Sequence, residues 1–210
     1  MTLELYTVDS FLEPRLHQKA YNYAMNRGQA RWGEVDMNPD LPTGLTVNMN
    51  DTEEIYKKFD VLCREKFPIV KDFEVVRMYI NCYMPYEQPQ FHQDTIDAPG
   101  LQSYTVLYYP QLEWDKNEGG CTEFVDDDHV YGSLPLPNRA LMFNGIHWHR
   151  ATPFRNHVRF TYAVKYEKID KDVFDFNADF ERSQESDAHK DYVNGSWLQF
   201  GQPIHSAQHY

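Results

Sequence analysis

Residues 74–84 read EVVRMYINCYM, and this stretch decides the class of fold. One set of alternate positions is apolar or small: Val76, Met78, Ile80 and Cys82. Successive side chains of an extended strand point to opposite faces, so a period of two predicts a half-buried β-strand. The change of period after Lys71 marks the start of a β-rich region.

Further strands are expected downstream, separated by turns. They are residues 90–95, 103–109, 121–124, 140–143, 146–151 and 159–166. Aromatic side chains suit a pleated, half-buried surface, and the chain has 15 Tyr and 13 Phe. Many short strands after a helical region predict a sandwich or barrel braced on one side by helices.

Two amphipathic helices are expected before the strands. Residues 10–27 place apolar side chains near helical spacing, and Gly28 would end that helix. Residues 51–67 begin with Asp51 as the expected N-cap and Glu54 three positions later, which is the spacing of a capping box.

Residues 31–50 are rich in Pro, Gly and Asn and predict a loop with one short strand at residues 45–47. A chain of 210 residues is long enough for one domain with a proper core. We expect residues 1–70 to form a helical and loop support, 71–168 the core, and 169–210 an extension docked on that core.

The formal net charge is −12, with 32 acidic and 20 basic residues, so the chain repels polyphosphates and nucleic acid is not an expected partner. No apolar stretch approaches the length of a membrane span, and no secretory leader is recognised, so a cytoplasmic location is expected. The three cysteines have no CxxC spacing and are interpreted as buried small hydrophobes in a reduced compartment.

The tripeptide His92-Gln93-Asp94 carries the first sign of chemistry. Residues i and i+2 of an extended segment share a face, so the imidazole and the carboxylate can bind one metal ion from the same side. A distant third ligand, His149, would complete a 2-His-1-carboxylate triad, the usual protein site for non-haem Fe(II). Arg159 lies ten residues further on, where a cation would suit the far end of a dicarboxylate.

Three further segments follow in a specific order. They are the strand-like residues 104–109, the Gly-Gly-x-Thr-x-Phe run at 119–124, and the apolar strand, glycine turn and histidine of 140–153. With residues 159–166, this order resembles the prolyl-hydroxylase-like branch of the Fe(II)/2-oxoglutarate-dependent dioxygenases. The resemblance covers about residues 74–166 and implies a mainly β, double-stranded β-helix (jelly-roll) core.

The resemblance implies that His92, Asp94 and His149 are the iron ligands. It also implies that Arg159 binds the C5 carboxylate of 2-oxoglutarate, with help from the hydroxyl of Tyr109. Tyr83, on the strand before the His-x-Asp motif, matches a residue that lines the co-substrate pocket; core packing is the alternative for both tyrosines.

His147 competes with His149, since both lie on one face of the same expected strand. The spacing to Pro153 and Arg159 favours His149 as the ligand, which leaves His147 as a donor beside the site or a pocket wall. Trp148 and Trp32 are further candidates for a substrate wall, and residues 31–45 for a lid.

The implied reaction consumes O2 and 2-oxoglutarate at Fe(II), releases succinate and CO2, and hydroxylates an unactivated C–H bond, with ascorbate as the expected reductant. The expected substrate is a prolyl residue in a protein or peptide. A free amino acid or another small molecule is the alternative, and the oligomeric state is not indicated.

Two other functions are considered. A nucleic-acid demethylase would have a second arginine six residues past the first, but that position is Lys165. A non-catalytic, metal-binding jelly-roll module has no reason to retain a carboxylate receptor such as Arg159 beside an open metal site.

Overall fold

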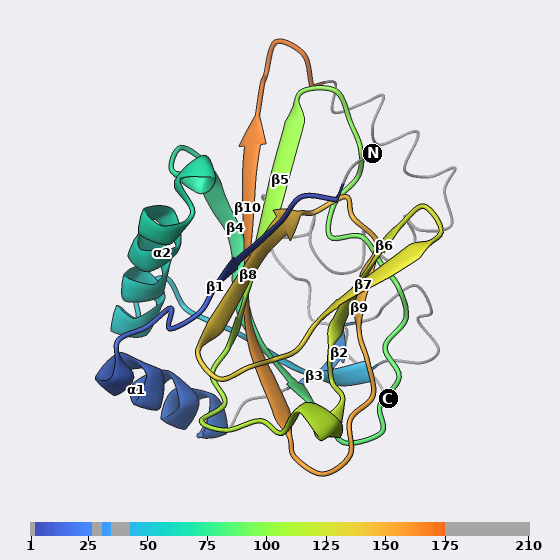
Figure 1. Ribbon diagram of the computed structural model, residues 1–210. Helices are drawn as coiled ribbons and strands as arrows, with labels where there is room; N and C mark the ends of the chain where they lie inside the picture. Colours follow the sequence, from blue (N-terminus) through green and yellow to red (C-terminus); the bar gives the residue numbers. More distant parts are fainter. Residues whose placement is uncertain (1–2, 27–30, 35–42, 175–210) are drawn as a thin grey trace, which may run out of the picture.

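The computed structural model describes residues 3–26, 31–34 and 43–174, which form two antiparallel sheets and two α-helices (Figure 1). The larger sheet has the strand order β1-β8-β5-β10-β4-β3-β2, and the smaller has the order β7-β6-β9. The strands of the larger sheet are β1 (Leu5–Val8), β2 (Arg31–Glu34), β3 (Thr43–Asn48), β4 (Glu74–Tyr83), β5 (Leu101–Tyr109), β8 (Arg139–Asn144) and β10 (Arg159–Ile169). Those of the smaller are β6 (Thr122–Asp126), β7 (His129–Ser133) and β9 (His149–Ala151).

Helices α1 (Pro14–Met25) and α2 (Glu54–Lys66) cover one face of the larger sheet, and the smaller sheet faces the other (Figure 1). Short 3-10 turns follow at η1 (Pro68–Val70) and η2 (Lys116–Glu118). None of the helices in the described part of the chain is long and apolar enough to cross a membrane.

Strand β10 lies in the middle of the larger sheet, paired on one side with β4 and on the other with β5. Its even-numbered side chains pack against the helices: Phe160, Tyr162, Val164 and Tyr166. Because side chains alternate along a strand, the odd-numbered ones face the smaller sheet. They are Arg159, Thr161, Ala163 and Lys165.

The helix-side core is aromatic. The ring centroid of Phe59 on α2 lies 5.3 Å from that of Tyr108 and 5.4 Å from that of Tyr162, so the helix packs directly on β5 and β10. A second, smaller apolar cluster fills the space between the sheets; it includes Leu107, Phe124 and Phe143. Phe124 and Phe143 come from opposite sheets and contact edge to face at 4.9 Å.

Both expected helices are present, but the predicted start of the second is wrong. Helix α2 begins at Glu54, with Glu53 in an extended conformation at the N-cap and no capping hydrogen bond from its side chain. The N-cap is therefore Glu53 and not Asp51. The Glu53 carboxylate accepts from the backbone N–H of Asn50 at 3.3 Å, outside the helix. Gly28 lies outside the described residues.

Strands are confirmed at the expected residues 74–84, 103–109, 121–124, 140–143 and 159–166, with small differences in their bounds. The strand expected at 146–151 is reduced to β9 (His149–Ala151), because residues 145–147 form a turn in which the His147 amide donates to the carbonyl of Asn144 at 3.1 Å. Residues 90–95 form no strand, because only His92 pairs with a neighbouring segment, through an isolated bridge. The sequence analysis does not predict strands β1 and β7, which are short edge strands. Strand β1 pairs with β8, which is distant in the sequence, and four of the five residues of β7 are exposed, so neither strand has a clear apolar pattern. Residues 31–50 contain two strands, β2 and β3, rather than one.

The cysteines are all free thiols. Cys63, on α2, is fully buried, whereas Cys82 and Cys121 are partly exposed, so the expectation of buried cysteines holds only for the first. The extension expected to dock on the core lies outside the described residues from residue 175 onward.

Candidate functional site

A backbone bridge joins His92 to His149. Each amide donates to the other residue's carbonyl oxygen at 2.9 Å, so the segment before β5 runs antiparallel to the start of β9. The two imidazole rings lie with their centroids 4.4 Å apart. Two histidines from distant segments therefore meet without belonging to one continuous strand pair.

Asp94 is placed by a second backbone contact, in which its amide donates to the carbonyl of Gly145 at 2.8 Å. A side chain at Gly145 would lie 2.8 Å from the Ser103 hydroxyl oxygen and 3.1 Å from a methyl carbon of Thr95. Glycine at this position therefore lets the turn after β8 lie against Ser103 and Thr95. The carboxylate of Asp94 is almost fully buried.

The three side chains form one cluster, in which a ligand atom from each lies within 4.8 Å of the others. The Nε2 atom of His149 is 3.5 Å from Oδ2 of Asp94, and Nε2 of His92 is 3.9 Å from Oδ1. The Nδ1 atoms contact backbone carbonyls, of Gln90 for His92 and of His147 for His149. A carbonyl only accepts, so Nδ1 carries the proton and each Nε2 keeps a lone pair for a metal.

The charges of the cluster suit a divalent cation. Burial lowers the pKa of His149 to about 4, although Asp94 opposes the shift, so the imidazole is neutral near pH 7. Burial raises the pKa of Asp94, but Lys165, His149 and His92 together hold it well below its usual range. Two neutral nitrogens and one carboxylate oxygen are a donor set that fits Fe(II).

Arg159 lines the same cavity as the three side chains. The residue is 1% exposed, and Nη2 of its guanidinium donates to the hydroxyl of Thr122 at 2.8 Å. The hydroxyl of Tyr109 lies 2.7 Å from the same Thr122 oxygen. The rings of Tyr109 and Tyr83 flank the guanidinium carbon at 5.3 and 5.8 Å.

Two nitrogens of that guanidinium, Nε and Nη1, are buried without any hydrogen-bond partner among the described residues. The hydroxyl of Thr161, two residues along β10 and on the same face, is also buried, unpartnered and part of the cavity wall. A buried charge without a partner is costly, so these atoms indicate a place for an anionic ligand.

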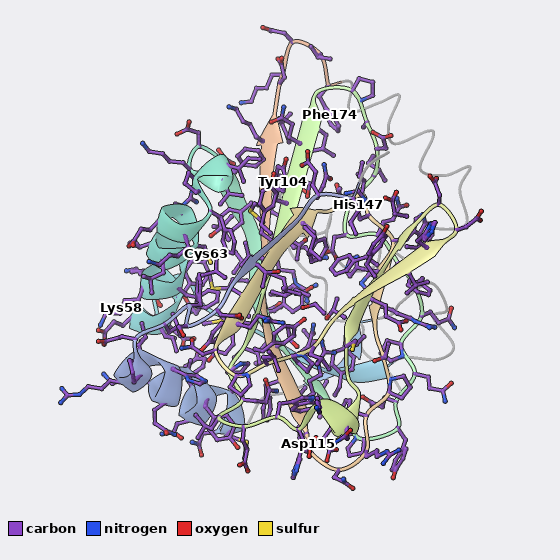
Figure 2. The ribbon with its side chains drawn as sticks, viewed as in Figure 1. Lys58, Cys63, Tyr104, Asp115, His147 and Phe174 are labelled. Atoms are coloured by element: carbon purple, nitrogen blue, oxygen red, sulfur yellow. The ribbon has the colours of Figure 1, made fainter. Side chains whose placement is uncertain are left out.

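Two other expected site residues, His147 and Trp148, do not line this cavity. His147 is buried, but its Nε2 accepts from the backbone N–H of Glu4 at 3.3 Å, beside the N-terminal strand (Figure 2). Trp148 is half-buried and does not line the cavity, while its carbonyl accepts from Val125. Trp32 pairs through its backbone with Leu45, and its side chain lies outside the described part of the structure.

The sequence did not single out several residues at the site. They are Thr122, Thr161, Asn81, Thr105 and Arg150, and the contact of Lys165 with Asp94 was also missed. Thr161 carried a signal, since it lies two residues after Arg159 on one expected strand. For the others, only the pairing of strands brings them to the site.

Residues 78–166 match the model of the 2OG-Fe(II) oxygenase superfamily. The fold is similar to a prolyl-4-hydroxylase from Pseudomonas putida, with TM-score 0.63, 13% identity, and coverage of 80% of this chain and 94% of that one. A prolyl hydroxylase from Trichoplax adhaerens was solved with a peptide fragment of the hypoxia inducible factor oxygen degradation domain. Its TM-score is 0.60 and its identity 16%, and the match covers 77% of this chain and 82% of that one.

The epimerase SnoN from nogalamycin biosynthesis, described as non-haem and alpha-ketoglutarate-dependent, gives TM-score 0.57, 11% identity, and coverage of 77% and 76%. Comparison with curated proteins gives no match. These similarities confirm the double-stranded β-helix core. Residues 78–166 are therefore similar to the 2OG-Fe(II) oxygenase superfamily, and the solved structures share the fold of this chain.

Proposed function

We propose that this protein is a dioxygenase that uses O2 to hydroxylate a prolyl side chain of a protein or peptide while it converts 2-oxoglutarate to succinate and CO2. The observation that carries the co-substrate assignment is the buried guanidinium of Arg159, with two unpartnered nitrogens, in the same cavity as His92, Asp94 and His149. A dicarboxylate bound to a metal at one end needs a cation at the other.

In this proposal, His92, Asp94 and His149 hold Fe(II) through two Nε2 atoms and one carboxylate oxygen. The bound iron supplies the activation of O2 that couples decarboxylation of the co-substrate to oxidation of a C–H bond. The protein keeps His149 neutral by burial and fixes both imidazoles by their Nδ1 contacts. These features support a metal site that is formed before the metal binds.

Arg159 receives the C5 carboxylate of 2-oxoglutarate through Nε and Nη1, the two nitrogens without partners in the described structure. A planar guanidinium binds a carboxylate with paired hydrogen bonds, and such charge-assisted bonds are stronger than neutral ones. Thr122 accepts from Nη2 and therefore holds the guanidinium in one orientation. Tyr109 acts on the same carboxylate or through Thr122, and Tyr83 forms a wall.

The cavity that Arg159 shares with His92, Asp94 and His149 is partly open to solvent, so one side chain of a larger substrate could reach the three candidate ligands. A structural neighbour solved with a peptide fragment supports the peptide class.

The test is an assay with Fe(II), 2-oxoglutarate and ascorbate on a set of proline-containing peptides, read by succinate release and by mass spectrometry. We expect a gain of one oxygen on a prolyl residue, together with succinate. The variant Asp94→Ala should release no succinate. If free proline or another small molecule gains the oxygen and no peptide does, the peptide assignment is wrong.

A further inference from the structure

Lys165 and Thr105 lie directly opposite each other on the paired strands β10 and β5. Both contact the carboxylate of Asp94, one at each oxygen. The ammonium nitrogen of Lys165 is 3.0 Å from Oδ1, and the hydroxyl of Thr105 donates to Oδ2 at 2.5 Å. This pair of strand neighbours therefore holds the two carboxylate oxygens from the side of the larger sheet.

The position of Lys165 follows from the strand period and from an irregularity in pairing. Lys165 lies on the same face of β10 as Arg159 and Thr161, toward the space between the sheets. The register of β10 against β4 shifts between Lys165 and Tyr166, and such irregularities re-aim side chains. The side chain is only 11% exposed, and lysine is rarely buried unless its charge is paired.

Lys165 is not among the residues that line the cavity, and its ammonium group contacts Asp94 instead. Its contact is with the carboxylate that the proposed function assigns to the metal. A carboxylate can bind a metal through one oxygen or through both. Binding through both would use a coordination position that the co-substrate or O2 needs.

We propose that Lys165 is a positioning residue that restricts Asp94 to a single metal-binding oxygen, Oδ2. Its ammonium group occupies Oδ1 and repels a second cation from that oxygen. The hydroxyl of Thr105 is neutral and leaves a lone pair on Oδ2. Oδ2 lies 3.5 Å from Nε2 of His149, whereas Oδ1 lies 3.9 Å from Nε2 of His92. This inference rests on the proposed metal site.

The experiment compares Lys165→Met with Lys168→Met, which makes the same change on an exposed residue of the same strand, and with Lys165→Arg, which keeps the cation. Calorimetry on metal-free protein measures Mn(II) affinity, and a second titration under nitrogen measures the affinity of the Mn(II)-loaded protein for 2-oxoglutarate. Mn(II) serves as the probe, so that binding is measured without an activity assay.

Lys165→Met should bind Mn(II) at least as tightly as the unmodified protein, because a repelling charge is lost and a second oxygen becomes accessible. Its affinity for 2-oxoglutarate should fall by about tenfold or more, because the second carboxylate oxygen would take a coordination position that the co-substrate needs. Lys165→Arg and Lys168→Met should leave both affinities within about threefold of the unmodified protein, which is well below that loss.

Unchanged 2-oxoglutarate affinity in a folded Lys165→Met protein would overturn the inference and leave the proposed function intact. A loss of Mn(II) binding in that protein would also overturn it, since Lys165 would then only stabilise the site. Failure of the unmodified protein to bind Mn(II) would instead refute the proposed function. If Lys165→Met does not fold, by circular dichroism, Lys165→Gln carries the same two measurements and is judged by the same outcomes.

Discussion

His92 and His149 are joined backbone to backbone, each amide donating to the other's carbonyl at 2.9 Å, although they come from distant parts of the chain. Main-chain contacts therefore hold the two residues side by side. Changes of a ligand side chain should consequently alter metal affinity while the surrounding backbone keeps its conformation.

Asp94→Asn should remove tight metal binding, because the amide carries no charge and offers only one weak acceptor oxygen. We expect Mn(II) affinity to fall by more than about 100-fold, which exceeds the usual effect of losing a residue that merely contacts a ligand. Calorimetry on metal-free protein measures this. The control is Asp97→Asn, an exposed carboxylate three residues away, and equal affinities of the two variants would refute the assignment of Asp94.

Arg159→Met should weaken 2-oxoglutarate binding and leave Mn(II) binding unchanged, because the guanidinium contacts the far end of the co-substrate and no metal ligand. In the unmodified, Mn(II)-loaded protein, 2-oxoglutarate at 100 times its Kd should raise the free energy of unfolding by about 2.7 kcal/mol. The same concentration should stabilise Arg159→Met much less. Urea unfolding with and without the co-substrate provides the measurement.

The matched control for that change is Arg155→Met, since Arg155 is exposed on the loop before β10. It should respond to 2-oxoglutarate as the unmodified protein does. If Arg159→Met shows the full stabilisation, the carboxylate lies elsewhere in the cavity.

Thr122→Val and Tyr109→Phe should each lower the affinity for 2-oxoglutarate, and their effects should not add. The two hydroxyls lie 2.7 Å apart, and Thr122 also accepts from Arg159, so each change disturbs the same contact. We expect a coupling free energy of about 0.5–3 kcal/mol in a double-mutant cycle. Additive losses would show that the two residues act independently.

Metal-free protein should lose stability as the pH falls from about 6.5 to about 4. Burial lowers the pKa of His149 to about 4, whereas the unfolded chain keeps the ordinary value near 6.5. Between these values the unfolded state binds a proton that the folded state does not, so acid favours unfolding, and the full contribution is present only above this window. Urea unfolding across the window, in the presence of EDTA, measures the slope.

His149→Gln is the comparison for this slope, because glutamine has no titrating group in the window. Its free energy of unfolding should depend less on pH than that of the unmodified protein. Parallel curves for the two proteins would mean that His149 does not contribute to the acid sensitivity.

Local sequence patterns predicted the strands that carry the site. The alternation in residues 74–84 predicted β4, and Met78 and Ile80 lie toward the helices. The expectation of a half-buried strand is wrong, because Tyr79, Asn81 and Tyr83 of the other face are buried as well. The aromatic alternation in residues 159–166 predicted β10 in the same way. In both strands, one face packs on the helix-side core, and this leaves a period of two in the residue types, which a single sequence displays.

Pairing between strands is what the sequence could not give. Residues 90–95 alternate like a strand, yet only His92 finds a partner there, because His149 lies at the very start of a three-residue strand. Nothing near Lys165 indicates that Thr105 is its cross-strand neighbour or that both contact Asp94.

The sequence by itself determined the β-rich class, the candidate ligand residues and the candidate cation, because these depend on residue type, on spacing within segments and on the order of motifs along the chain that carries the family resemblance. The tertiary structure decided which side chains share a cavity. It separated His147 from that cavity and gave Arg159 the neighbours Thr122 and Tyr109. Contacts between distant segments depend on sheet order and register, and these are set by the burial of whole faces rather than by any local pattern.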